Sequence, residues 1–204
     1  MAGRPREFDR DEALAKARDL FWERGYEGVS MADLVEAMGI ASARIYAAFE
    51  SKEALFQEAV TLYASGEGGF ATRALAEEPN VLDAFKRLLR DAVLLYTRPN
   101  HPHGCMIVMA ATNYTINSQA VRTRLGRYRR DRAGSLHERL KKASETGELK
   151  SDADPCALAE FYAAFLHGLS VQAADGVPRE ILLSTLPHAL LPLKSAMSVK
   201  ADSL

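Results

Sequence analysis

Apolar residues recur every three or four positions along most of the chain, which is the spacing of an amphipathic α-helix. The first stripe of this kind ends before Gly25, a residue type that often terminates helices. It comprises Ala13, Leu14, Ala17, Leu20 and Phe21. The sequence shows neither the sustained alternation of apolar and polar residues nor the two-residue turns that would indicate strands and hairpins. The pattern therefore predicts an all-α fold of about nine helices.

Two short helices are predicted after this first one. Ser30 can cap the N-terminus of the earlier of the two, with Asp33 as its capping-box partner. That helix is expected over Met31–Met38, because Gly39 follows it directly. The second short helix is expected over Ser42–Ala48.

The rest of the chain is also predicted to be helical. A fourth helix begins after Ser51 as its N-cap and is expected to loosen at the glycine-rich residues 66–69. Prolines suit the first turns of three later helices, where a missing backbone N–H costs nothing. The later helices are predicted at Pro79–Thr97, Gly104–Asn117, Ser118–Thr146, Pro155–Asp175 and Pro178–Ser195. We expect two domains, residues 1–52 and residues 53–204.

The two short helices, joined by a turn at Gly39–Ala41, match a helix-turn-helix unit. No acidic residue occurs in the stretch 37–49, and Arg44 is its sole charge. Arg44 could pair with a guanine edge, while Tyr46 could bind a phosphate and Lys52 could add positive charge beside the next helix N-terminus. The outward face of the second helix is expected to present Ser42, Ala43, Arg44 and Ala47. The alternative is an ordinary helical hairpin inside a bundle.

Residues 1–60 also carry a recognisable set of positions. The most specific is the run Tyr-x-x-Phe-x-Ser-Lys-x-x-Leu-Phe at 46–56. The other matching positions are Gly3 to Arg6, Ala17, Phe21 to Tyr26, Ser30, Leu34, Gly39 and Ile40. With these residues the segment resembles the N-terminal domain of TetR/AcrR-type transcriptional repressors. The resemblance implies a three-helix DNA-binding domain joined to a ligand-responsive helical domain, acting as a homodimer on a palindromic operator in double-stranded DNA.

The resemblance also implies roles for individual residues. Phosphates would be held by Ser30, Tyr46 and Lys52, and bases would be faced by Ser42, Ala43 and Arg44. Because Ala41 stands where family members often have Ser or Asn, we expect the N-cap of the recognition helix to shift to Ser42. Arg4 and Arg6 precede the first helix and could reach into a minor groove. A disordered, solubilising tail is the alternative for this arm.

A ligand-responsive repressor needs a second site that is coupled to DNA binding. We expect this inducer pocket within the helices of residues 63–114, apolar apart from a few placed polar groups. Its candidate lining residues are Phe70, Phe85, Leu88, Leu89, Tyr96, Met106, Met109, Asn113, Tyr114, Phe161 and Phe165. The alternative is that these residues are ordinary core, and nothing in the sequence identifies the small-molecule inducer.

The segment His101–Cys105 is the most chemically suggestive loop. Cys105 stands at a predicted helix N-terminus, where the helix dipole and free amides favour a thiolate, and His103 is two residues away. Cys105 is therefore a candidate sensor of oxidants or electrophiles. Two alternatives are an inert structural thiol and a soft-metal site in a metal-responsive regulator. We predict no metal site and no cofactor.

Composition and charge limit the remaining possibilities. The chain has 26 basic and 27 acidic side chains and a net charge of −1, so overall charge does not point to nucleic acid. The basic segment 122–142 is interpreted as the solvated face of a long helix. The longest apolar run, residues 105–111, is far too short for a membrane span, and the charged N-terminus leads into no signal-peptide segment. With only two cysteines, the sequence favours a cytoplasmic protein without a membrane partner.

The last two predicted helices are rich in alanine, leucine and aromatic residues, which could pair with their symmetry mates in a homodimer. The resemblance supports that dimer. Sequence motifs of serine hydrolases, P-loop enzymes and zinc peptidases are absent, so the chain is not expected to be an enzyme. The competing function is a helical adaptor that binds protein. Such an adaptor would not need an acid-free helix followed by Tyr46 and Lys52.

Overall fold

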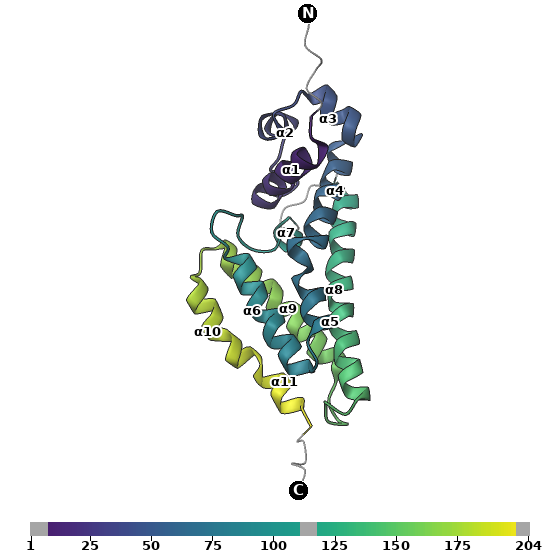
Figure 1. The fold of residues 1–204 in the computed structure, drawn as a ribbon, viewed down its shortest axis with the longest axis vertical. Coiled ribbons are helices and arrows are strands. Elements are labelled where there is room, and N and C mark those ends of the chain that lie inside the picture. Colours follow the sequence, from purple (N-terminus) through teal and green to yellow (C-terminus); the bar gives the residue numbers. More distant parts are fainter. Residues whose placement is uncertain (1–7, 111–117, 199–204) are drawn as a thin grey trace, which may run out of the picture.

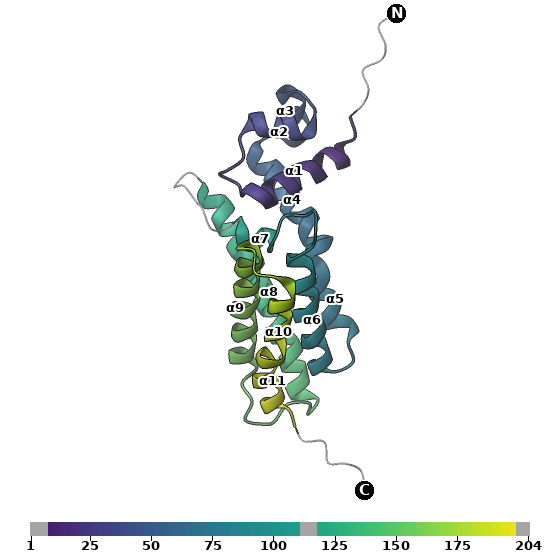
Figure 2. The ribbon, with the colours of Figure 1, turned by 90° about the vertical axis from the view of Figure 1, so that its left-hand side faces the viewer.

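A computed structural model describes residues 8–110 and 118–198 of the chain. The fold is all-α, as predicted, and elongated, with a small N-terminal unit at one end and a longer bundle below it (Figures 1 and 2). Within the described residues the β-structure is limited to one isolated bridge between Leu149 and Met197. None of the described helices has the length and apolar character needed to cross a membrane.

The N-terminal unit consists of α1 (Arg10–Arg24), α2 (Met31–Met38) and α3 (Ser42–Phe49). Helix α2 begins with the expected capping box between Ser30 and Asp33. Its C-cap, Gly39, has φ 70° and ψ 23°, a left-handed conformation that glycine adopts without steric cost.

The expected shift of the α3 N-cap to Ser42 is wrong. Ala41 is the N-cap, with extended backbone angles, because its carbonyl accepts the first helical hydrogen bonds from the amides of Arg44 and Ile45 at 2.8 and 3.2 Å. Alanine has no side-chain acceptor, so α3 starts without a side-chain cap.

Helix α4 (Lys52–Ser65) joins this unit to the rest of the chain and is followed by a 3-10 turn, η1 (Glu67–Gly69), and by α5 (Phe70–Glu77). The break predicted at residues 66–69 is therefore present. The buried side chains of α4 pack into the same core as α1 and α2; they are Leu55, Phe56, Ala59, Val60 and Tyr63.

The bundle is built from α6, α8, α9 and α10, with α7 at its junction with the N-terminal unit (Figure 1). Its elements are α6 (Val81–Tyr96), α7 (Met106–Met109), α8 (Gln119–Glu145), α9 (Pro155–Ala174), α10 (Arg179–Ala189) and α11 (Leu191–Ala196). The long helices predicted from Ser118 and Pro155 are confirmed, and Pro155 occupies the first turn of α9.

Three predicted helix boundaries in this part are wrong. Pro79 lies outside α6, because the Asn80 side chain accepts the amide of Asp83 and caps the helix one residue later. Pro178 is the N-cap of α10 and is not in its first turn. The last predicted helix is divided at Leu190. Pro192 lies in the first turn of α11, where it has no backbone N–H to donate and its ring crowds the preceding turn.

The described part of the segment predicted as a helix over Gly104–Asn117 contains only the short α7, with Cys105 as its N-cap. The remaining predicted positions up to 117 lie outside the described residues.

Two buried clusters fill the molecule. The first belongs to the N-terminal unit and α4 and also takes in Met106 and Val121, while the second fills the bundle. Leu95 and Cys105 are partly buried and pack against both clusters. The two parts are therefore joined through a continuous apolar contact at the level of Cys105.

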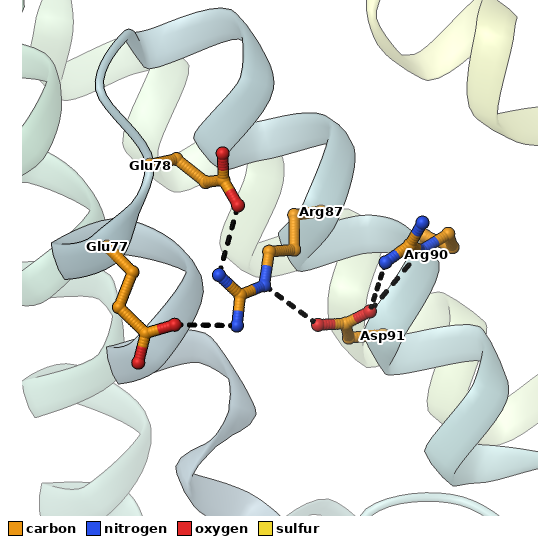
Figure 3. A network of polar contacts seen from close by, with 5 residues as sticks. All are labelled: Glu77, Glu78, Arg87, Arg90 and Asp91. Atoms are coloured by element: carbon orange, nitrogen blue, oxygen red, sulfur yellow. Dashed lines mark hydrogen bonds and ion pairs between the residues drawn. The ribbon is translucent and has the colours of Figure 1, made fainter.

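An arginine network fastens the α5–α6 corner (Figure 3). The Arg87 guanidinium contacts the carboxylates of Glu77 at 2.8 Å, Glu78 at 3.0 Å and Asp91 at 3.4 Å. Arg90 contacts only Asp91 within this network. The hydrogen bonds to Glu77 and Glu78 raise the pKa of Arg87 above its already high ordinary value.

Candidate nucleic-acid interface

The outward face of α3 carries the side chains that the sequence predicts there. Ile45 and Phe49 are each 1% exposed and hold the helix on its core, whereas Tyr46 is 48% exposed. Arg44 is also exposed, as are Ala43 and Ala47, and Ser42 is half-buried. The helix thus presents one guanidinium and one phenol among small side chains, with no acidic side chain between them.

Lys52 is positioned by the aromatic ring of Tyr26, a matching position for which no role towards Lys52 was expected. Its Nζ lies 4.3 Å from the centroid of the Tyr26 ring, a cation–π geometry. Burial lowers the pKa of Lys52, while the charges of Glu27 and Asp33 oppose that shift. Tyr26 is fixed in turn by edge contact with Phe56, at 5.1 Å between ring centroids.

The hydroxyl of Ser30 is already engaged within α2. It accepts the Asp33 amide at 3.1 Å and also contacts the Asp33 carboxylate. The hydrogen bonds from Ser30 lower the pKa of Asp33. The phosphate contact of Ser30 stays a prediction. To make that contact, the Ser30 hydroxyl would have to bind a phosphate while it also caps α2 through Asp33.

Arg10 holds the C-terminal end of α3, a role that the sequence did not predict. Its guanidinium donates to the Ala48 carbonyl at 3.2 Å and to Glu58 at 2.8 Å, and it lies 4.3 Å from the centroid of the Phe49 ring. These partners are 38 to 48 residues away in sequence, so no local pattern could have revealed them. The predicted arm residues Arg4 and Arg6 lie outside the described residues.

The residues predicted to line an inducer pocket do not form one group. Phe70, Phe85, Leu88, Leu89 and Tyr96 are buried in the bundle core. Met106 is buried in the N-terminal cluster, and Met109 is half-buried. Phe161 is 41% exposed and, together with Phe165, lines a shallow pocket of about 320 Å³ between α9 and α10. Asn113 and Tyr114 lie outside the described residues.

Cys105 lies where the two buried clusters meet. The Tyr63 hydroxyl donates to Cys105 Sγ at 3.4 Å, and the Cys105 backbone amide donates to Ser170 Oγ at 2.8 Å. Burial raises the pKa of Tyr63 and of Tyr96, and the neighbouring Cys105 adds to both shifts. The thiol is thus partly buried among phenols.

The neighbouring histidines do not join Cys105 in a metal site. His103 is exposed, and the His101 ring lies 6.5 Å from the Trp22 ring. Among residues 8–110 and 118–198, no group of three His, Cys, Asp or Glu side chains is arranged to hold a metal ion.

Three large apolar side chains of the last helices are exposed to solvent: Phe161 at 41%, Ile181 at 56% and Leu191 at 56%. They come from α9, α10 and α11, the elements formed by the last two predicted helices.

Comparisons with known proteins agree with this architecture. Residues 13–59 match the family described as bacterial regulatory proteins, tetR family, and residues 81–175 match the tetracyclin repressor-like C-terminal domain. The chain is 32% identical over 182 residues to the HTH-type transcriptional repressor ComR of Escherichia coli, covering 89% of this chain and 87% of that protein.

Solved structures extend the comparison to three dimensions. A cysteine mutant of the TetR family transcriptional regulator CifR, complexed with a 26-base-pair operator DNA, superimposes with a TM-score of 0.88 at 45% identity, covering 92% of this chain and 98% of that chain. The reduced form of NemR from E. coli shares the fold, with a TM-score of 0.73 at 21% identity, covering 94% of this chain and 98% of that chain. On the two matched domains and these relatives, the chain belongs to the TetR family of transcriptional regulators.

Proposed function

We propose that this protein is a transcriptional repressor that binds a palindromic operator as a homodimer and is released by a small-molecule or thiol-reactive inducer. Residues 1–52 form its DNA-binding domain and residues 53–204 its ligand-binding and dimerisation domain, with α4 joining the two. The observation that carries the proposal is the outward face of α3, which is free of acidic side chains and carries Arg44 and Tyr46 on a buried base of Ile45 and Phe49.

The DNA contacts divide into two kinds. Arg44 reads base edges, accompanied by Ser42, Ala43 and Ala47, because a guanidinium can pair with a guanine through two hydrogen bonds. Tyr46 and Lys52 hold phosphates, which fixes the position of α3 but carries no sequence information. Ser30 and the arm residues Arg4 and Arg6 add further contacts to the DNA backbone. The operator complex of CifR, which is 45% identical to this chain, supports operator binding by this protein.

A DNA-binding measurement separates these roles. Fluorescence anisotropy should show tight, salt-dependent binding to DNA from upstream of the protein's own gene and weak binding to a random duplex. Arg44→Ala should reduce the difference between the two duplexes. Lys52→Ala should weaken binding to both and lower the salt slope by about 0.9, the value for one phosphate contact. Full selectivity and an unchanged salt slope in both variants would contradict the assignment.

The homodimer is proposed to form through α9, α10 and α11. The exposed side chains of Phe161, Ile181 and Leu191 supply an apolar face of the kind that associates in solution. Sedimentation equilibrium should give a dimer for the native chain, and Ile181→Asp should shift the equilibrium towards monomer. An unchanged dimer in that variant would place the interface elsewhere.

Release is proposed to begin at Cys105 or at the core around it. Among the described residues, the predicted aromatic and leucine pocket residues of the bundle are buried in its core, so we expect a small molecule to displace packed residues there or to react at the partly buried Cys105 thiol. With iodoacetamide as a probe, Cys105 Sγ forms a bond to the methylene carbon, the C–I bond breaks, iodide leaves with the electron pair and the thiol proton passes to solvent.

The second cysteine offers a matched control for this step. Cys156 is exposed at the start of α9, away from the junction. Alkylation should weaken operator binding by the native chain and by Cys156→Ser, and should leave Cys105→Ser unaffected. Equal weakening in Cys105→Ser would show that the thiol is not the trigger.

A further inference from the structure

Two contacts join the end of α1 to the Cys105 segment. The Trp22 indole N–H donates to the carbonyl of Gly104 at 3.1 Å, although the two residues are 82 positions apart. The Trp22 ring also meets the Tyr63 ring edge-on, at 4.7 Å between centroids. Tyr63 in turn donates its hydroxyl to Cys105. Trp22 is therefore connected to Cys105 through the backbone on one side and through a phenol on the other.

The acceptor of this hydrogen bond is held on both sides. The Gly104 amide donates to the Tyr96 carbonyl at 2.9 Å, and the next amide, that of Cys105, donates to the buried Ser170. A Cβ at position 104 would come within 2.7 Å of the Ser170 carbonyl oxygen. The backbone at Gly104 is thus closely packed against Ser170, directly next to Cys105, and we expect a group added to the Cys105 sulfur to disturb the peptide that Trp22 holds.

The other end of α1 contacts the recognition helix. Trp22 lies in the last turn of α1, and Arg10 begins the same helix. Arg10 donates to the Ala48 carbonyl near the end of α3. One helix therefore spans the distance from the Gly104 carbonyl to the recognition helix, and it offers a physical connection between the two ends.

We propose that Trp22 is a positioning residue for operator binding: its hydrogen bond to Gly104 sets the orientation of α1, and a change at Cys105 reaches α3 by releasing that bond. This inference rests on the proposed function, in which α3 binds the operator and Cys105 is the site of release. Trp22 itself contacts no DNA.

A first experiment reads the hydrogen bond directly and needs no DNA. Trp22 is the only tryptophan in the chain, so tryptophan emission reports on the surroundings of this side chain. In a Cys156→Ser background, complete alkylation with iodoacetamide should change the wavelength of maximum emission, because the surroundings of the indole N–H change when it loses the Gly104 carbonyl. Unchanged emission after alkylation confirmed by mass would overturn the proposal.

A second experiment measures the coupling. The ratio of operator Kd values after and before alkylation should be about tenfold in the Cys156→Ser background, within the usual range for coupled sites. Adding Trp22→Phe keeps an aromatic ring but removes the N–H, so the ratio should fall towards unity. An undiminished ratio in a folded Trp22→Phe variant, checked by circular dichroism, would overturn the proposal.

The bundle supplies a matched control. Tyr162 donates its buried hydroxyl to the Ala189 carbonyl at 3.0 Å, far along the chain from Cys105. Tyr162→Phe removes a comparable buried hydrogen bond and should preserve the ratio. If the ratio of operator Kd values fell towards unity in Tyr162→Phe as well, the Trp22 effect would reflect a general loss of stability, and the proposal would be overturned. Failure of the reduced protein to bind any operator would contradict the proposed function, whereas the emission experiment would still test whether a change at Cys105 releases the hydrogen bond of Trp22.

Discussion

Replacing Gly104 by alanine tests the packing at the junction. Gly104 has φ +78°, and a Cβ there would lie 2.7 Å from the Ser170 carbonyl oxygen and 3.0 Å from Met109 Cγ. The left-handed backbone alone costs a residue with a Cβ about 1–2 kcal/mol. Forcing a methyl group into a filled site adds about 1–3 kcal/mol. Gly104→Ala should therefore lower the free energy of unfolding by about 2–5 kcal/mol.

Gly147→Ala separates the two contributions. Gly147 has φ +75°, but no described atom lies within 4 Å of the position of its Cβ. Gly147→Ala should therefore lower the free energy of unfolding only by the cost of the left-handed backbone, about 1–2 kcal/mol. Urea unfolding of the native chain and both variants, at one protein concentration to hold any dimer contribution constant, measures the difference. Equal destabilisation by the two variants would refute the claim that the segment is tightly packed against Ser170.

Three further predictions follow from the described contacts. Burial and nearby arginines lower the pKa of His167, so the unfolded chain binds a proton at this histidine more tightly than the folded chain does. The free energy of unfolding should therefore fall as pH drops below about 6.5. Urea unfolding of His167→Gln should show a shallower fall. Arg87→Ala should lower the Tm by removing contacts to three carboxylates, whereas Arg90→Ala, with a 62% exposed side chain, should leave the Tm within error. Tyr26→Leu should weaken operator binding, measured by anisotropy, because Lys52 loses the aromatic ring that holds it. Tyr26→Phe should keep the operator affinity because the ring remains, and equal losses of affinity in the two variants would exclude the ring as the cause.

The elements that were predicted correctly depend on near neighbours in sequence. The capping box of Ser30 and Asp33 spans three residues, and the exposed face of α3 follows from helical spacing alone. Boundary errors arose where a nearby side chain competed with a general preference. Asn80 capped α6 one residue beyond Pro79, since its side-chain oxygen could accept an amide and proline offers no such group.

Aromatic spacing did not distinguish interior from surface in the C-terminal part. Phe85 and Phe161 both lie at helical spacing, yet Phe85 is fully buried and Phe161 is 41% exposed. A large apolar side chain gains from burial in a core or in an interface between subunits, so its identity does not decide which of the two it serves. The fold of a single chain distinguishes core residues from possible interface residues, because it shows which helix faces are covered within the chain.

The sequence by itself determined the all-α class, the helix-turn-helix spacing and the outward side chains of α3, because each depends on contacts within one or two helical turns. Only the tertiary structure decided that Trp22 meets Gly104 and that Arg10 meets Ala48. The buried indole of Trp22 requires an acceptor and the exposed guanidinium of Arg10 can donate to one, but nearly every residue offers a carbonyl. The partner is selected by how the N-terminal core and the bundle core pack together, and no periodicity in the chain encodes that choice.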